Sequence, residues 1–537
     1  DVKELVIGCL TQVVRSTARN IKSGWKNAFQ VLHVAGRDKP EPIVLSAFDL
    51  LRKIVQDSFP QIVSDEAHGS AAYVDCINCL TTYASNQDFT PISLEAIDLI
   101  QRCTSMILQT LTNSDERLSF GDSEQHVRLW FPVLTGLSRI SSDPRQIVRG
   151  KALEVLFDVL LSKGELFSPR LWELVFQGVL YPLFDDVYHM DEIHDTEWLR
   201  TTLRPAMMKL TELFAAFFPA VGGMLRQFLK ILTSCVKHQN EHVAEIGLGS
   251  IKELLAKTAN QLTPEMWVAV CETMTGLFEH AGPLSDAETA EETQSVDQKV
   301  KLVETRHKIR MHLFNLVQDL CKDHVDALGD NMDVLLNLLG TAHKTALEST
   351  TGQQQPMQGQ LAQLGQLGAQ KYMQWIFAES AEASRSELTF MFNAYRAQWD
   401  EGGNKKPGAH PDAQIAALET RLMDRVVDVL QKYSGIAAEG HHKPSPQTAQ
   451  AQVAASPAPV QEPVDPQAEQ IRWILAPTLM VILEGFMSLQ QPRFESCLGR
   501  IYPHLCALIE CNDVRVRIVV TDLFLRKIGP ALGLQGR

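Results

Sequence analysis

The feature that most limits the fold of this chain is a pair of amphipathic helical segments that recurs along most of its length. Within residues 20–36 the apolar side chains recur at helical spacing and share one face: Trp25, Ala28, Phe29, Leu32 and Ala35. A polar turn at 37–40 follows, and a second run then begins with its own apolar face: Ile43, Val44, Ala47, Phe48, Leu51 and Ile54. Together the two runs predict a helical hairpin.

The ends of the first helix carry the usual boundary signals. Ser23 stands just before the apolar face, and we expect its side chain to accept a free N–H of the first turn. Gly36 ends the run, and we expect it to take the left-handed conformation that closes many helices.

The same periodicity predicts helices along the rest of the chain: 2–18, 72–83, 93–111, 127–138, 147–161, 170–183, 198–218, 221–237, 241–257, 263–280, 299–321, 325–347, 371–399, 413–433, 470–489, 494–511 and 514–528. Pro132 is expected in the early turns of its helix, where a missing N–H is tolerated. Pro205 is expected to kink the helix 198–218, and Pro264 to occupy a first helical position. No alternating β-pattern of useful length occurs, so the predicted fold class is all-α.

A short motif repeats where the second helix of a pair begins. The stretches 143–153, 240–248 and 512–520 each have a polar cap, one or two β-branched residues, and then small and apolar residues. This pattern is typical of the inner helix of HEAT and armadillo repeats. The sequence therefore predicts a HEAT/armadillo-like α-solenoid of stacked helical hairpins.

Composition shifts divide the chain into five parts. We expect an N-terminal HEAT-like solenoid at 1–280, an acidic linker at 281–298 and a helical region at 299–436 that contains a Gln/Gly-rich insert at 349–369. A Pro/Ala/Gln-rich segment at 437–469 is expected to be a disordered linker, since it cannot bury a core, and helical repeats follow at 470–537.

Net charge, the length of uncharged runs and the distribution of cysteines argue against several classes of protein. A formal charge of -14 without a clustered basic face argues against nucleic-acid binding. The longest uncharged run near the middle, 213–225, is interrupted by Pro219 and is too short for a bilayer, which takes about 20 residues, so we expect no transmembrane segment. The ten cysteines are scattered and are expected to be free, buried thiols.

Motifs for catalysis or cofactor binding are absent from the sequence. It has no glycine-rich phosphate loop and no recognisable nucleophile–histidine motif. Cys76 and Cys79 form a lone CxxC without the further ligands that zinc needs, and His441-His442 lies in the predicted linker. The acidic segment 185–195 matches no calcium loop. We therefore predict no catalytic, cofactor-binding or metal-binding residue, and no enzyme activity in this chain.

Trp25 has two interpretations. A tryptophan on an apolar helical face is usually a core residue, which is the interpretation that we favour. Its polar neighbours Lys22, Ser23, Lys26 and Asn27 are not explained by core packing, and these four form the candidate partner-binding surface.

Several of these residues resemble a known family. Residues 20–27, NIKSGWKN, closely resemble the NIRSGWKN segment of the large brefeldin-A-inhibited guanine nucleotide exchange factors for Arf GTPases. Further landmarks are similar to that family's: Trp130-Phe131-Pro132 with Arg149-Gly150, Phe184-Asp185-Asp186 with Glu197-Trp198-Leu199, and Tyr502-Pro503 in the last repeat. The residues expected to be structural signatures are Asn20, Gly24, Trp25, Trp130, Phe131, Pro132, Trp198, Tyr502 and Pro503. The resemblance covers 1–280 well, 470–529 fairly, and the middle only faintly.

This resemblance implies the helical region downstream of a Sec-seven-type exchange domain, and the start at Asp1 leads us to expect a fragment of something longer. It implies a non-catalytic regulatory region that binds small GTPases of Arf or Rab type and governs membrane recruitment, autoinhibition or homodimerisation. Such a protein would lie in the cytoplasm and peripherally on Golgi, trans-Golgi or endosomal membranes, and act in vesicle-mediated protein transport. The alternative is a trafficking scaffold similar to the Mon-two proteins, without exchange activity.

Overall fold

The computed structural model describes residues 2–64, 69–113, 124–184, 196–238, 240–281, 296–323, 365–400, 402, 404–406, 412–439, 466–509 and 513–534. The regular structure in these ranges is helical, and their one β-type feature is an isolated bridge between Trp399 and Lys405. The chain forms two compact units, Asp1–Gln261 and Leu262–Arg537, which are described separately below. The all-α prediction is confirmed.

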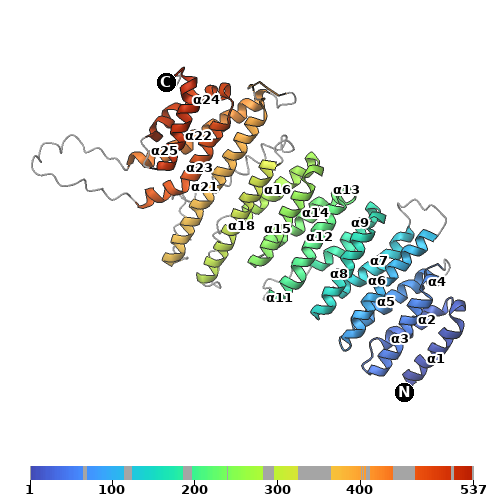
Figure 1. The fold of residues 1–537 in the computed structure, drawn as a ribbon. Helices are drawn as coiled ribbons and strands as arrows, with labels where there is room; N and C mark the ends of the chain where they lie inside the picture. The colour runs from blue at the N-terminus through green and yellow to red at the C-terminus, as the bar shows by residue number, and fades with distance from the viewer. Residues whose placement is uncertain are drawn as a thin grey trace, which may run out of the picture. The chain divides into compact units, whose positions relative to one another are not determined.

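The first unit consists of two layers of helices (Figure 1). Neighbouring helices in the first layer pack side by side: α2 (Gly24–Ala35), α5 (Gly69–Ala84), α7 (Glu124–Ile140) and α9 (Pro169–Val175). The second layer is built in the same way: α1 (Val2–Thr17), α3 (Glu41–Asp57), α6 (Thr90–Asn113), α8 (Gln146–Lys163), α12 (Arg204–Ala216) and α15 (Glu241–Thr258). Each first-layer helix is followed in the chain by a second-layer helix, so the predicted solenoid of stacked hairpins is confirmed.

Shorter elements complete this unit. Helical turns lie at the hairpin ends: Ala18–Asn20, α4 (Phe59–Ser64), Gly164–Leu166, Tyr181–Phe184, α11 (Thr196–Trp198), α13 (Phe218–Val221), Gly222–Met224 and Ala259–Gln261. The helix α14 (Leu225–Val236) packs on α15. Two π-helical turns, Phe176–Leu180 and Leu199–Leu203, extend α9 and precede α12.

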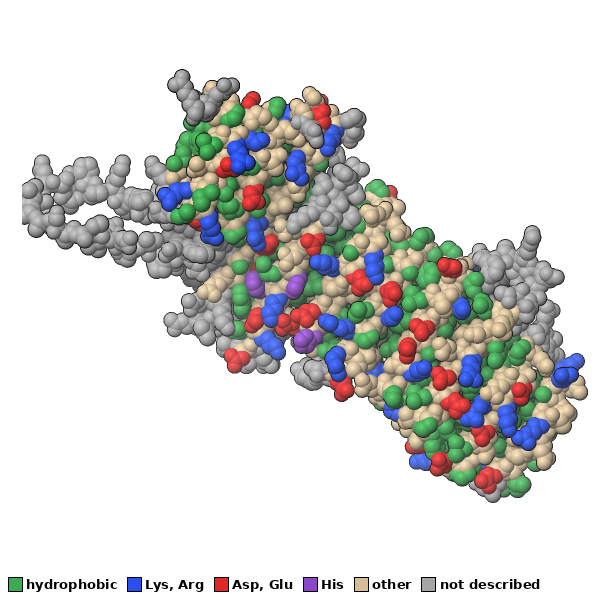
Figure 2. Space-filling model, in the orientation of Figure 1, with side chains coloured by type: hydrophobic (Ala, Val, Ile, Leu, Met, Phe, Trp, Pro, Cys, Tyr) green, Lys and Arg blue, Asp and Glu red, His purple; other side chains and the backbone are tan. Residues whose placement is uncertain are grey.

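A row of aromatic rings joins successive hairpins through the core. The ring centroids of Trp130 on α7 and Phe167 lie 5.5 Å apart, and those of Phe167 and Trp172 on α9 lie 5.2 Å apart. Further along, the rings of Phe214 on α12 and Phe228 on α14 stack at 4.5 Å. These ring contacts join successive hairpins in the second half of the unit. On the surface, charged side chains of both signs are interspersed (Figure 2).

Both predicted boundary signals of α2 are wrong. The Ser23 side chain makes no capping hydrogen bond, and its backbone is helical, at φ -60° and ψ -17°. Gly36 is also right-handed, at φ -66° and ψ -15°. A Cβ atom at Gly36 would lie 2.9 Å from Cε2 of Tyr83. Glycine is therefore required here by the close approach of the Tyr83 ring, and not by backbone conformation.

The two internal prolines also behave differently from expectation. Pro132 lies inside α7, because that helix begins at Glu124 and not at Val127. The Tyr73 hydroxyl donates to the carbonyl oxygen of Leu129, close to the position where Pro132 withholds its N–H. Pro205 lies in the first turn of α12, directly after a π-helical turn. The 89° bend of this part of the chain falls between Ala216 and Phe218, and not at Pro205.

The second unit is also built of packed helices: α16 (Pro264–His280), α18 (Val296–Asp323), α21 (Gly365–Ala397), α22 (Asp412–Glu439), α23 (Pro466–Ser488), α24 (Gln491–Ile509), α25 (Val514–Leu523), a π-helical turn Phe524–Ile528 and α26 (Gly529–Ala531). α21 lies between α18 and α23, and α22 packs on α24. Thr263 accepts a hydrogen bond from the N–H of Met266, and Pro264 stands in the first turn of α16, as predicted.

Several predictions fall on segments outside the described residues. These include the helix 325–347, most of the linker 281–298, most of the insert 349–369 and most of the segment 437–469. At their edges α18 already begins at Val296 and α21 at Gly365. Among the described helices none by itself combines the length and apolar character of a membrane span; Leu199–Ala216 and Phe218–Val236 do so only as a pair bent by 89°.

Candidate partner-binding surface

The four predicted surface residues lie at the beginning of α2. Lys22, Ser23, Lys26 and Asn27 are exposed, whereas Trp25 between them is only 5% exposed. Trp25 points into the core, where its ring stacks on that of Phe29 at 5.7 Å. Helical spacing therefore divides this segment into a buried aromatic face and a polar outer face. Trp25 is a core residue, as expected, and its four polar neighbours are free to meet solvent or a partner.

The helix α2 is held in place by side chains of α5. The Cys79 thiol donates to the Phe29 carbonyl oxygen at 3.0 Å, and the Tyr83 hydroxyl donates to that of Leu32 at 2.9 Å. Burial raises the pKa of Cys79 to about 12, so this thiol stays protonated at neutral pH. Cys76 and Cys79 are both buried, and they act as core thiols of α5. The surface of α2 is thus presented on a fixed helix.

One carboxylate faces the exposed side of α2. Burial raises the pKa of Asp75 on α5, and the positive charges of Lys26 and His33 oppose that rise. Asp75 is half-buried, while Lys26 is exposed. The polar face of α2 thus carries two exposed lysines, Lys22 and Lys26, and Lys26 interacts with the carboxylate of Asp75.

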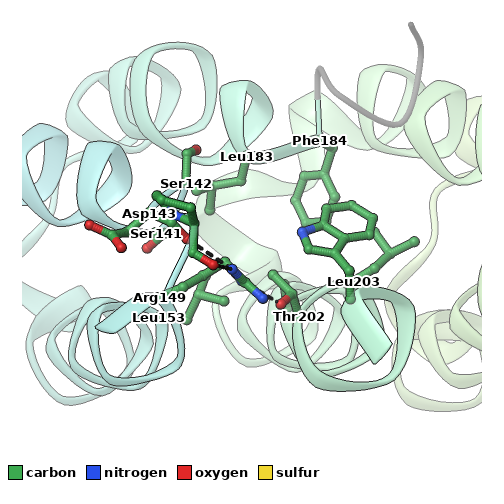
Figure 3. A pocket seen from close by; sticks show the side chains of 12 residues that line it. Ser141, Ser142, Asp143, Arg149, Leu153, Leu183, Phe184, Thr202 and Leu203 are labelled. Atoms are coloured by element: carbon green, nitrogen blue, oxygen red, sulfur yellow. Dashed lines mark hydrogen bonds between the residues drawn. The ribbon is translucent and has the colours of Figure 1, made fainter. Parts of the chain in front are cut away.

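Two of the family-like landmarks meet at a second place in the first unit (Figure 3). Arg149 on α8 and Phe184 and Trp198 from the next hairpin line one cavity of ≈ 280 Å³. Within it the Arg149 Nε donates to the Thr202 hydroxyl at 2.7 Å, and one terminal guanidinium nitrogen donates to the carbonyl oxygen of Asp143 at 2.8 Å. Arg149 therefore ties its own hairpin turn to the following hairpin.

A second arginine of the same turn reaches in the opposite direction. The Arg145 guanidinium pairs with the Asp143 carboxylate, with Nε to Oδ1 at 3.0 Å. Its terminal nitrogens donate to the Ala84 carbonyl oxygen and the Ser93 hydroxyl, both at 3.2 Å, in the preceding hairpin. The repeated turn motif is evident in the sequence, but it does not indicate what these two arginines contact. The sequence signal that could have indicated these contacts is the position of two arginines, Arg145 and Arg149, shortly after Asp143 in the turn.

The remaining signature residues differ in exposure. Trp130 is fully buried, Phe131, Pro132 and Trp198 are half-buried, and Asn20 and Gly24 are exposed. In the second unit Pro503 lies inside α24, and Tyr502 is 38% exposed with its ring 6.3 Å from that of Phe524. Of these signature residues, Asn20, Gly24 and Tyr502 are exposed at the surface, whereas Trp130 is part of the core.

The described residues contain no group of three or more His, Cys, Asp or Glu side chains placed to hold a metal ion. The acidic segment 185–195 and His441-His442 lie outside the described residues.

Three family models match this chain in consecutive order. Residues 1–53 match a family described as "Mon2/Sec7/BIG1-like, HDS", residues 130–278 match "GBF1-like, tetratrico peptide repeat region", and residues 308–525 match "BIG2 C-terminal domain". Brefeldin A-inhibited guanine nucleotide-exchange protein 3 of Arabidopsis thaliana is 24% identical over 99% of this chain and 32% of its own length. Along its length the chain is therefore similar to the large brefeldin A-inhibited guanine nucleotide-exchange proteins.

Two further exchange proteins show a similar match. Exchange protein 2 of Arabidopsis thaliana is 25% identical over 99% of this chain and 33% of its own length, and human exchange protein 1 is 28% identical over 52% and 15%. The chain thus spans about a third of the length of the first two relatives. The match at 308–525 also corrects the expectation that the middle of the chain resembles the family only faintly, since degenerate helical repeats carry few short motifs.

Solved structures resemble the chain only loosely. A circular tandem repeat protein aligns over 97% of this chain and 99% of its own, at 12% identity and a TM-score of 0.25, and a SYS-1/POP-1 complex aligns over 98% and 96%, at 10% and 0.24.

Proposed function

We propose that this chain is a non-catalytic regulatory region of an Arf guanine nucleotide exchange factor, and that it acts by binding small GTPases of Arf or Rab type. The observation that supports the proposal is the division of the family-like segment 20–27. Its tryptophan serves the core, while Lys22, Ser23, Lys26 and Asn27 face outward from a helix that α5 holds in place. Core packing accounts for Trp25 and leaves those four residues for a partner.

The proposed surface lies on the first layer of helices. The helix α2, which carries this surface, packs beside α5 among the first helices of the hairpins. A GTPase that uses Lys22 and Lys26 would therefore meet this first layer. Membrane recruitment, autoinhibition and homodimerisation are further roles that we assign to the region, as is a place on Golgi, trans-Golgi or endosomal membranes.

The test is binding of the chain to a panel of Arf and Rab proteins, each loaded with GTP or GDP, by biolayer interferometry. We expect preference for one or more GTP-loaded proteins. The double variant Lys22→Ala/Lys26→Ala should weaken that binding by roughly two- to tenfold, the range for exposed charges at an interface. Lys53→Ala on α3, another exposed lysine, is the matched control. Equal binding of both nucleotide states across the panel would contradict the proposal.

A second candidate is a trafficking scaffold without exchange activity. It is favoured by the match of residues 1–53 to a family whose description includes Mon2. The two candidates differ in one measurable property of the full-length protein, which is acceleration of nucleotide release from Arf. Release at the spontaneous rate would favour the scaffold.

A further inference from the structure

A pocket lies where the C-terminal ends of three first-layer helices meet. α2 ends at Ala35, α5 at Ala84 and α7 at Ile140, and the pocket between these ends has a volume of ≈ 440 Å³. The Asn86 amide donates to the Gly36 carbonyl oxygen at 2.9 Å and closes the end of α2. The close contact between Gly36 and the Tyr83 ring brings these ends together. The walls of the pocket are thus formed by the ends of α5 and α7 and by the turns that follow α2 and α5.

Two arginines from different helices line this pocket. Arg37 follows α2, Arg139 lies in the last turn of α7, and both side chains are exposed. Neither guanidinium makes an ion pair or hydrogen bond with the described part of the chain, whereas nearby Lys3 pairs with Asp38. Asp88 is the acidic residue among those that line the pocket.

The pKa of a histidine beside the pocket is affected by both arginines. His33 Nδ1 lies 3.0 Å from the hydroxyl oxygen of Thr82, which itself lines the pocket. Burial lowers the pKa of His33, the positive charges of Arg37 and Arg139 lower it further, and the carboxylate of Asp75 opposes them. Both guanidinium groups therefore lie close enough to the imidazole to affect its charge, in agreement with their place in the lining of the pocket.

We propose that this pocket binds the carboxylates of an acidic segment of a partner protein, with Arg37 and Arg139 as the two contacting groups. A guanidinium presents parallel N–H donors that match the two oxygens of a carboxylate. Thr82, Asn86 and Gln87 supply further polar atoms around the same space. The chain as a whole carries a charge of -14 and repels an acidic segment, so a local pair of unneutralised arginines fixes where such a segment docks. This proposal is independent of GTPase binding at the other end of α2.

A purely structural role for the two arginines makes different predictions. Cations near helix C-termini offset the partial negative charge of the helix dipole. In that case their replacement would lower stability and would leave binding of an acidic ligand unchanged. The two roles are therefore separated by measuring binding and thermal unfolding on the same variants.

The experiment measures the fluorescence anisotropy of a short, labelled polyglutamate peptide titrated with the full chain at low ionic strength. Arg37→Gln and Arg139→Gln should each weaken binding by roughly two- to fivefold, as expected for an exposed charge pair. Arg170→Gln, at the exposed N-terminal end of α9, should not change it. Asp88→Asn removes a repelling carboxylate and should strengthen binding by a similar factor. Added salt should weaken every complex, because exposed charges are screened over about 10 Å at 0.1 M.

A second readout follows the His33 imidazole by NMR, with the His33→Gln variant used for assignment. A carboxylate between Arg37 and Arg139 offsets their charge, so the peptide should raise the pKa of His33. No detectable binding, or binding that both arginine variants leave unchanged, would overturn the proposal. So would an Arg37- and Arg139-dependent attachment to phosphatidylserine vesicles in the absence of peptide binding, because that would identify a membrane as the ligand.

Discussion

Replacement of Gly36 by alanine tests whether tertiary contact or backbone conformation makes this position a glycine. Its φ of -66° is one that alanine adopts freely, so local propensity predicts a gain of about 0.4–1 kcal/mol. The added Cβ would however lie 2.9 Å and 3.0 Å from Cε2 and Cζ of Tyr83. That ring cannot easily move away, because its hydroxyl donates to the Leu32 carbonyl oxygen and its centroid lies 5.3 Å from that of the tilted Phe48 ring. Overpacking of this kind costs about 1–3 kcal/mol, so we expect net destabilisation.

The assay is native-state hydrogen exchange of the α2 and α5 amides, which reports local stability in a chain of two units. The double-mutant cycle with Tyr83→Leu supplies the control. Once the ring is removed, Gly36→Ala should become neutral or stabilising, and the coupling energy should be of order 1 kcal/mol or more. Unchanged or slower exchange in the single Gly36→Ala variant would refute the reasoning, as would a cycle that shows no coupling.

Three further predictions concern the first unit. Trp25→Ala should destabilise it by about 3–5 kcal/mol, measured by urea unfolding, whereas retained stability would mean that this side chain is not in the core. Arg149→Ala should lower the free energy of unfolding by about 1–3 kcal/mol, because the Thr202 hydroxyl and two turn carbonyls lose a buried partner. The conservative Arg149→Lys variant should keep only part of that stability, and full stability in this variant would show that charge alone matters. Native Cys79 should resist thiol reagents at pH 8, whereas the exposed Cys9 should react. Because the pKa of Cys79 is raised to about 12 in the folded chain, its contribution to stability should be complete below the ordinary thiol pKa near 9 and should fall as pH rises towards 12. A urea midpoint that does not change between pH 8 and pH 11 would contradict this.

The elements of this fold could be predicted from the sequence because their signals are local. Apolar residues at helical spacing defined α2 and α3 as a hairpin, and the same spacing placed Trp25 on the inner face. The place of Pro264 in the first turn of α16 was equally local and was correct. The resemblance of residues 20–27 to the exchange-factor family also depended only on consecutive residues, and the family matches confirmed it.

What only the tertiary structure decided depends on which helices stack against each other. Gly36 looked like a backbone signal, but the ring of Tyr83 from another hairpin determines it. Arg145 lies just before α8 and Arg149 in its first turn, yet they bind the preceding and the following hairpin. Arg37 and Arg139 share a pocket only because α2, α5 and α7 end side by side. Helical periodicity determines which side of a helix is buried, whereas the stacking of hairpins determines which distant side chains that packing brings together.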